Sequence, residues 1–276
     1  MSKNELPAGS CDCHVHVFGD AERYPPKADA AYPPPLATRE HLEQMHASVG
    51  IARAVLVQPT IYGTDHRVLL EGILGQSQYR GVAVVNDDVT DRELLTLHEA
   101  GIRAARFSLG GPLGAMPRAE LDRSIARICE LGWHAKFGGA ARDFIANRDW
   151  LQRFDGIAVL DHLAGTNPAD GLAGQVISLV EELLRGGNWW ILLANADRRS
   201  QTAQGWDDML PFVQTIVAAA PNRAIWATDW PHVLYGQRAL PDDAMLVAFL
   251  ERAVPDRATL EDILVHNPAR LYGFGP

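Results

Sequence analysis

Short apolar runs alternate with longer amphipathic stretches along almost the whole chain. In eight of these runs, apolar, β-branched and aromatic residues follow one another closely enough to predict buried strands. The predicted strands cover residues 11–18, 52–59, 81–85, 101–108, 134–138, 157–162, 189–194 and 224–229. Between them, apolar residues recur at intervals of three and four, which is typical of helices. The predicted helices cover residues 39–49, 64–76, 91–100, 119–131, 142–154, 175–185, 207–220, 242–253 and 259–271.

This alternation predicts an α/β fold. Strands that are apolar throughout, each followed by a helix, are typical of parallel strands covered on both faces. Eight such units predict a closed (β/α)8 TIM barrel, and no repeat or linker divides residues 1–276 into more than one domain. A doubly wound open sheet is the alternative, but no G-x-G-x-x-G segment follows the first strand.

The connection after the first strand is unusually long. Residues 19–36 contain five prolines and two tyrosines. Loops of this length inside a compact domain are usually functional or disordered, and the aromatic residues favour a lid over the mouth of the barrel. The loop leads to Thr38, which we predict to cap the following helix, and Gly50 is predicted to end that helix.

Composition and charge exclude several classes of protein. The 276 residues are 47% hydrophobic and carry a formal net charge of −9. Because the basic residues are scattered singly, neither nucleic acid nor an anionic membrane is expected as a partner. The apolar runs are far shorter than the roughly 20 residues that a membrane-spanning helix needs. We expect a monomer or a small homo-oligomer.

The first ten residues and the cysteines point to a reducing compartment. Residues 1–10 are mostly polar and do not resemble a signal peptide. Three cysteines are an odd number, so a disulfide framework is not expected and the cytoplasm is the expected location. Cys11 and Cys13 alternate along a strand and could form a zinc pair, but no second cysteine pair accompanies them.

The first candidate for a functional site is the H-x-H motif in the first strand, His14-Val15-His16. The period of two along a strand sends His14 and His16 to the same side. Such a pair can bind a metal, polarise a carbonyl or form hydrogen bonds inside a core. At the far end of the chain, Asp229 lies where the eighth strand gives way to a loop marked by Pro231. Active-site residues of α/β barrels lie at such C-terminal strand ends.

The other strand ends add further polar candidates. They are Gln58 and Thr60 after strand 2, Arg106 in strand 4, Lys136 in strand 5, His162 after strand 6, Asn195 and Arg198 after strand 7, and His232 after strand 8. Arg106 could instead form a salt bridge with a helix, and the short fifth strand leaves the direction of Lys136 open. Asp161 precedes His162, so on a strand it would face the opposite way and support the site from behind.

Taken together, these motifs resemble the amidohydrolase superfamily, and within it the 2-pyrone-4,6-dicarboxylate hydrolase group of lactonases. The likeness runs nearly from end to end. It is carried by segments 12–19 (DCHVHVFG), 57–58 (VQ), 63–65 (GTD), 80–85 (RGVAVV), 101–103 (GIR), 106–107 (RF), 161–162 (DH), 197–198 (DR), 227–232 (ATDWPH) and 266–272 (HNPARLY).

The resemblance implies a role for each matching residue. Asp229 would be the general base that takes a proton from the attacking water. His14, His16 and His162 would donate to or polarise the lactone carbonyl. Arg106 and Arg198 would bind a substrate carboxylate. The other residues expected to bind substrate are Gln58, Thr60, Lys136, Asn195 and His232.

Two departures from the family pattern change what is expected. Metal-dependent relatives usually have an acidic or carboxylated group after strand 4 and a histidine after strand 5, where this chain has Arg106 and Lys136. Two cations would repel a divalent ion, so no metal is expected; the alternative is one zinc ion held by His14, His16 and Asp229. Segments 110–112 (GGP) and 163–165 (LAG) lack the basic residues of the dicarboxylate hydrolases. A substrate with fewer carboxylates, or with another acidic group, is expected.

The sequence therefore predicts a hydrolase that opens the ring of a small carboxylated lactone, in breakdown of aromatic compounds or sugar acids. A lactone isomerase, or a metal-dependent decarboxylase of an aromatic acid, is the alternative on the same scaffold. A barrel that only binds an acidic ligand is a third hypothesis. Asp229 argues against it, because a carboxylate in the site repels an anion unless it performs chemistry.

Overall fold

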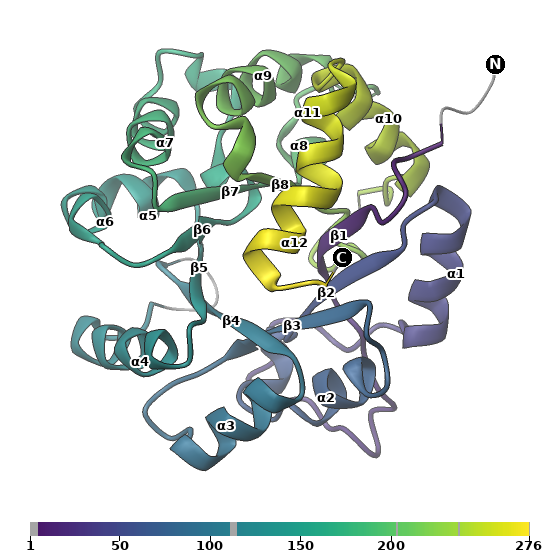
Figure 1. Ribbon diagram of the computed structural model, residues 1–276, viewed down its shortest axis with the longest axis vertical. Coiled ribbons are helices and arrows are strands. Elements are labelled where there is room, and N and C mark those ends of the chain that lie inside the picture. Colours follow the sequence, from purple (N-terminus) through teal and green to yellow (C-terminus); the bar gives the residue numbers. More distant parts are fainter. Residues whose placement is uncertain (1–4, 111–114, 203, 237, 276) are drawn as a thin grey trace.

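Eight parallel strands form the centre of the molecule in the computed structural model, which describes residues 5–110, 115–202, 204–236 and 238–275. Each strand pairs with the next along the chain, in the order β1 to β8 (Figure 1). The strands are β1 (Cys11–Val15), β2 (Arg53–Val57), β3 (Tyr79–Val84), β4 (Ile102–Ser108), β5 (His134–Gly138), β6 (Ala158–Leu160), β7 (Trp189–Leu193) and β8 (Ala224–Trp226).

Backbone hydrogen bonds join the two ends of the sheet. The amide of Asp229 donates to the carbonyl of His14 at 3.2 Å, and the amide of His16 donates to the carbonyl of Trp230 at 2.8 Å. Below them, the carboxylate of Asp12 in β1 accepts from the hydroxyl and the amide of Thr228, at 2.5 and 3.1 Å. The predicted (β/α)8 barrel is confirmed.

Helices surround the strands on the outside (Figure 1). They are α1 (Arg39–Val49), α2 (Arg67–Ile73), α3 (Asp91–Glu99), α4 (Arg118–Glu130), α5 (Ala141–Ala146), α6 (Arg148–Arg153), α7 (Gln175–Gly186), α8 (Ala196–Arg199), α9 (Leu210–Ala219), α10 (Asp243–Ala253), α11 (Arg257–Glu261) and α12 (Asn267–Tyr272). The predicted caps of the first helix are confirmed: the hydroxyl of Thr38 accepts from the amide of His41, and Gly50 is left-handed with φ 80°.

Several element boundaries differ from those predicted. The predicted helix 142–154 is divided into α5 and α6 at Asn147, and the predicted helix 259–271 contains a π-helical segment, Asp262–His266. The short helix α8 was not predicted. Strands β6 and β8 end earlier than expected because the chain turns to positive φ at His162 (49°) and Asp229 (63°).

The last helix closes one end of the barrel. In Figure 1, α11 and α12 cross in front of the strands. Tyr272 at the end of α12 is fully buried in an inner apolar cluster with Cys11, Cys13 and Trp190. The amide of Asn267 donates to the carbonyl of Ala224, the first residue of β8. The N-terminal strand ends are therefore sealed, and the two cysteines of the C-x-C motif serve in packing.

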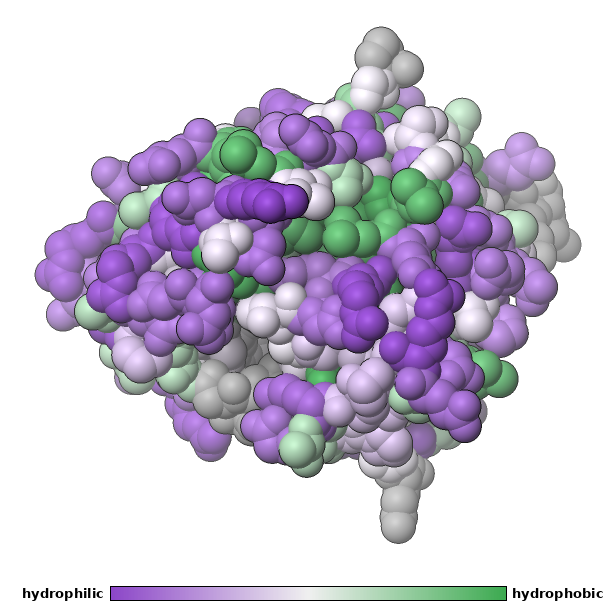
Figure 2. Space-filling view, turned by 90° about the horizontal axis from the view of Figure 1, so that it is seen from below, coloured by the Kyte–Doolittle hydropathy of each residue, from purple (hydrophilic) through white to green (hydrophobic). Residues whose placement is uncertain are grey.

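The outside of the barrel is mainly polar on the side of α2, α3 and α4. Hydrophilic residues cover most of this face, with hydrophobic residues gathered near its centre (Figure 2). In the described part of the chain, no helix is both long and apolar enough to cross a membrane.

Candidate functional site

Backbone strain is concentrated at the C-terminal ends of the last three strands. Among the described residues, eight non-glycine residues have positive φ, and only Trp206 lies elsewhere. Such conformations cost about 1–3 kcal/mol each and tend to gather at functional sites. The other seven are His162, Leu163, Ala164, Asn195, Asp229, His232 and Leu234. The turns bring side chains from β6, β7 and β8 toward the mouth of the barrel.

A cavity of about 690 Å³ opens at this end of the barrel. Its size suits a small organic molecule, since ligand pockets typically measure about 300–1,000 Å³. The predicted residues that line it are His16, Thr60, Arg106, His162, Asn195, Arg198 and Asp229. The structure therefore brings together seven of the eleven candidates, drawn from the ends of six strands.

His14, His16 and Asp229 converge beside this cavity, whose lining includes His16 and Asp229 but not His14. The Nε2 atoms of His14 and His16 lie 3.7 and 3.8 Å from Oδ1 of Asp229. Nδ1 of His16 is 2.8 Å from the carbonyl oxygen of Val57, which can only accept, so Nδ1 carries the proton and Nε2 offers a lone pair. Burial lowers the pKa of His16 to about 4. His16 is therefore neutral at pH 7.

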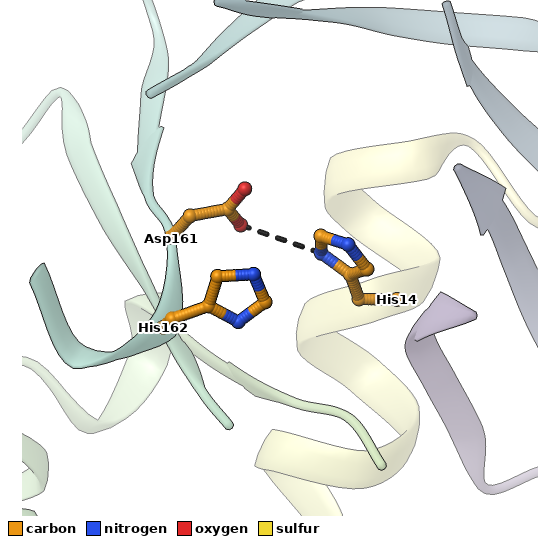
Figure 3. A group of neighbouring side chains, drawn as sticks. All are labelled: His14, Asp161 and His162. Atoms are coloured by element: carbon orange, nitrogen blue, oxygen red, sulfur yellow. Dashed lines mark ion pairs between the residues drawn. The ribbon is translucent and has the colours of Figure 1, made fainter. Parts of the chain in front are cut away.

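Behind His14 lies a buried ion pair. Oδ1 of Asp161 is 3.5 Å from Nδ1 of His14 and 3.1 Å from Nζ of Lys136, and all three side chains are fully buried. Because β6 ends at Leu160, Asp161 and His162 both approach His14, as Figure 3 shows. The expectation that Asp161 faces away from His162 is corrected by this turn, although Asp161 does support His14 from behind.

Asp229 is also paired with Arg198. Nη2 of Arg198 donates to Oδ2 of Asp229 at 3.3 Å and to the carbonyl of Val233 at 2.8 Å. The guanidinium also stacks over the ring of Tyr235, 4.4 Å from its centroid. Burial alone would raise the pKa of Asp229, but the surrounding histidines and Arg198 lower it below its usual value. Asp229 is therefore ionised at neutral pH.

Three predicted substrate ligands do not line the cavity. The amide of Gln58 donates to the carbonyls of Gly63 and Asp65, at 3.0 and 2.9 Å, and so holds the loop after β2. Nε2 of His232 is 3.0 Å from Oδ1 of Asp243 at the start of α10. Nζ of Lys136 forms an ion pair with Oδ1 of Asp161, at 3.1 Å. Their predicted contact with substrate is not supported by the geometry.

Other residues at the cavity were not predicted. Lys27 and Tyr32 reach it from the long loop after β1, and Arg199 follows Arg198 in α8. The two tyrosines of that loop were a signal for a lid, but they did not identify Tyr32 itself. Among the described residues, no carboxylate lies within ion-pair distance of Arg106 or Arg199. Both cations are therefore available to an anionic ligand.

Segment 163–165, which departs from the family pattern, is buried beside the cavity, and segment 110–112 begins at the cavity wall. Leu163 and Ala164 are fully buried. A Cβ atom at Gly165 would lie 2.6 Å from the amide nitrogen of Ala141, so no larger side chain fits there. This segment brings no cation to the cavity. Gly110 lines the cavity, whereas Gly111 and Pro112 lie outside the described residues.

The site has a ligand set that fits one divalent cation. The ligand atoms of His14, His16 and Asp229 lie within 4.8 Å of one another. An acceptor stands behind each imidazole, Asp161 for His14 and the carbonyl of Val57 for His16, as is usual for metal-binding histidines. The charge of Lys136 is balanced by Asp161, so it does not oppose a cation as the sequence suggested. Arg106 remains as an unbalanced charge.

Comparison with known proteins agrees with the motifs. Residues 11–274 match the family described as Amidohydrolase. A 2-pyrone-4,6-dicarboxylate hydrolase of Comamonas testosteroni is 32% identical, over 97% of this chain and 91% of the relative. A 4-sulfomuconolactone hydrolase of Hydrogenophaga intermedia is 30% identical, over 97% and 90%. An Agrobacterium tumefaciens protein solved in its apo form matches with a TM-score of 0.89 at 25% identity, over 99% and 97%. The chain therefore belongs to the amidohydrolase family, as its motifs predicted.

Proposed function

We propose that the protein hydrolyses a small lactone that carries an acidic group. The observation that carries the proposal is an ionised, buried carboxylate, Asp229, at the bottom of a cavity that also presents Arg106 and Arg199 without acidic partners. A site built only to bind an anion gains nothing from that carboxylate. The names of the two hydrolases reported above, which act on a pyrone dicarboxylate and a sulfomuconolactone, support a cyclic ester with an acidic substituent.

In the proposed reaction, a water molecule attacks the lactone carbonyl and Asp229 takes one of its protons. The second proton of the water is held by an Nε2 lone pair of His16 or His14, both of which face Oδ1 of Asp229. The C–O bond of the ring then breaks, and Asp229 returns its proton to the leaving ring oxygen. The product is an open-chain hydroxy acid that carries one more carboxylate than the substrate.

Polarisation of the carbonyl is assigned to His162. Nε2 of His16 cannot donate while its Nδ1 proton is bound to Val57, so that task falls to other groups at the cavity. His162 lines the cavity, and its ring centroid lies 4.7 Å from that of His14. Thr60 and Asn195 supply further polar contacts at the cavity wall. For His162 this is the role that the family resemblance implies, whereas His14 and His16 are proposed here to accept from the water instead.

A bound metal is an alternative to the water contacts of His14 and His16, because it would occupy the same lone pairs. His14, His16 and Asp229 would hold the ion, which would polarise the lactone carbonyl and lower the pKa of a bound water. The expectation from the sequence, that the enzyme works without a metal, stays a prediction and now rests on Arg106 alone.

The test is turnover of a panel of five- and six-membered lactones, each with and without a carboxylate or sulfonate, followed by metal analysis of the same sample. We expect hydrolysis of at least one anionic lactone and much slower hydrolysis of its neutral counterpart. Isomerisation without net uptake of water would favour the lactone isomerase instead. Failure to convert any anionic lactone would overturn the proposal.

A further inference from the structure

Lys136, Asp161 and His14 form a line of charged and polar groups inside the barrel. Nζ of Lys136 is 3.1 Å from Oδ1 of Asp161, and the same oxygen is 3.5 Å from Nδ1 of His14. Nζ also donates to the carbonyl of Cys13 in β1, at 3.4 Å. None of the three side chains is exposed, and neither Lys136 nor Asp161 lines the cavity. The pair therefore does not meet the substrate.

Stability does not explain why the barrel keeps this pair. Taking two charges out of water costs several kcal/mol per ion, and apolar residues of similar volume often serve as well or better. The surroundings would accept such residues, since Cys13, Val159 and Ala104 on the neighbouring strands are buried in an apolar cluster. The pair therefore more plainly serves His14, whose Nδ1 lies 3.5 Å from Oδ1 of Asp161.

We propose that Lys136 and Asp161 are positioning residues that hold His14 in the tautomer with the proton on Nδ1, so that the Nε2 lone pair faces Asp229. Oδ1 of Asp161 lies 3.5 Å from Nδ1 and a carboxylate can only accept, so this neighbour favours a proton on Nδ1. Lys136 holds Oδ1 of Asp161 from the opposite side. His162, the neighbour of Asp161 in sequence, also lies against His14 (Figure 3). Without Lys136, the carboxylate would be free to turn toward His162.

The geometry gives His14 the same orientation that His16 obtains from the backbone. Nδ1 of His16 donates to the carbonyl of Val57 at 2.8 Å. The two imidazoles thus present equivalent lone pairs to Oδ1 of Asp229, at 3.7 and 3.8 Å. One is fixed by a main-chain carbonyl, which a side-chain substitution leaves in place, and the other by a side-chain pair. Only the second can be removed by mutation.

The first test is the ¹⁵N NMR spectrum of protein labelled at histidine, which reports the tautomer of each ring. His16 is an internal reference for the Nδ1–H form. His66, whose Nε2 donates to the carbonyl of Val84 at 2.9 Å, is a reference for the Nε2–H form. We expect His14 to match His16 in the native protein and to lose that form in Asp161→Leu, which leaves no acceptor beside Nδ1, while the two references stay unchanged. A native His14 in the Nε2–H form, or one unaffected by Asp161→Leu, would overturn the proposal.

The second test separates positioning from packing, and it rests on the proposed lactone hydrolysis. Asp161→Asn and Lys136→Met each leave one buried charge without its partner and should lower stability by about 3–5 kcal/mol. The double variant Lys136→Met/Asp161→Leu removes both charges and should recover most of the melting temperature. Its kcat should stay about 10- to 100-fold below that of the native enzyme, with KM changed much less.

The outcomes distinguish the two proposals. If the double variant recovers both the melting temperature and kcat, the pair is only structural and the inference is wrong. If no lactone is hydrolysed by the native enzyme, the proposed function fails, but the tautomer of His14 still decides the inference. If either single variant does not fold, the double variant is examined by both NMR and kinetics, and a His14 tautomer identical to the native one would refute the positioning role.

Discussion

Arg106 is the residue whose removal should separate charged from neutral substrates most clearly. It lies in β4, lines the cavity and has no acidic partner among the described residues. A charge-assisted hydrogen bond contributes about 1.5–3 kcal/mol, so Arg106→Met should reduce kcat/KM for an anionic lactone by about 10- to 200-fold. Most of the loss should appear in KM. Initial rates of ring opening, measured over a range of concentrations for an anionic lactone and its neutral counterpart, give kcat and KM for each substrate.

The same substitution should leave the fold intact. Because no protein carboxylate depends on Arg106, its loss strands no buried charge, and the melting temperature should stay near the native value. Arg103→Met is a matched control in the same strand, since Arg103 donates to the carbonyls of His98 and Ile102 and does not line the cavity. It should leave kcat/KM unchanged for both substrates. Equal losses for charged and neutral lactones in Arg106→Met would refute the assignment of Arg106 to anion binding.

Three further predictions follow from the same geometry. Arg198→Met removes a cation that lowers the pKa of Asp229, so the acidic limb of the pH–rate profile should move to higher pH; an unmoved limb would contradict the pairing. Activity should survive a chelator, because the unbalanced charge of Arg106 disfavours a divalent ion; loss of activity that zinc restores would show the opposite. Thr228→Val leaves the buried carboxylate of Asp12 short of a donor and should cost about 1–3 kcal/mol in urea denaturation.

Much of the fold could be predicted because its signals are local. Apolar runs and helical periodicity identified the strands, and the caps at Thr38 and Gly50 marked the ends of α1. The break at Asn147 and the π-helical segment 262–266 were missed because they interrupt sequences whose apolar spacing is otherwise continuous. Helix α8 is too short, at 4 residues, to show any periodicity.

The candidate site was only partly predictable because it depends on distant parts of the chain. The motifs identified His14, His16, His162 and Asp229 correctly as neighbours. The direction of Lys136 could not be predicted, because it depends on the pairing of β5 with β6, which places Lys136 beside Val159. The hydrogen-bond partners of Gln58 and His232, which do not line the cavity, are set by how loops fold back, and no pattern in the sequence indicates that.

The most direct test of the central claim is the kcat of Asp229→Asn on the substrate identified by the lactone panel. Asparagine keeps the size and one oxygen of the side chain while it removes the negative charge, so the protein should fold. General-base assistance contributes about 10²–10⁴-fold, and the loss should appear in kcat more than in KM. We expect a folded protein whose kcat is lower by that factor. A folded Asp229→Asn that retains most of the native kcat would contradict the central claim, because the water would then be activated by another group.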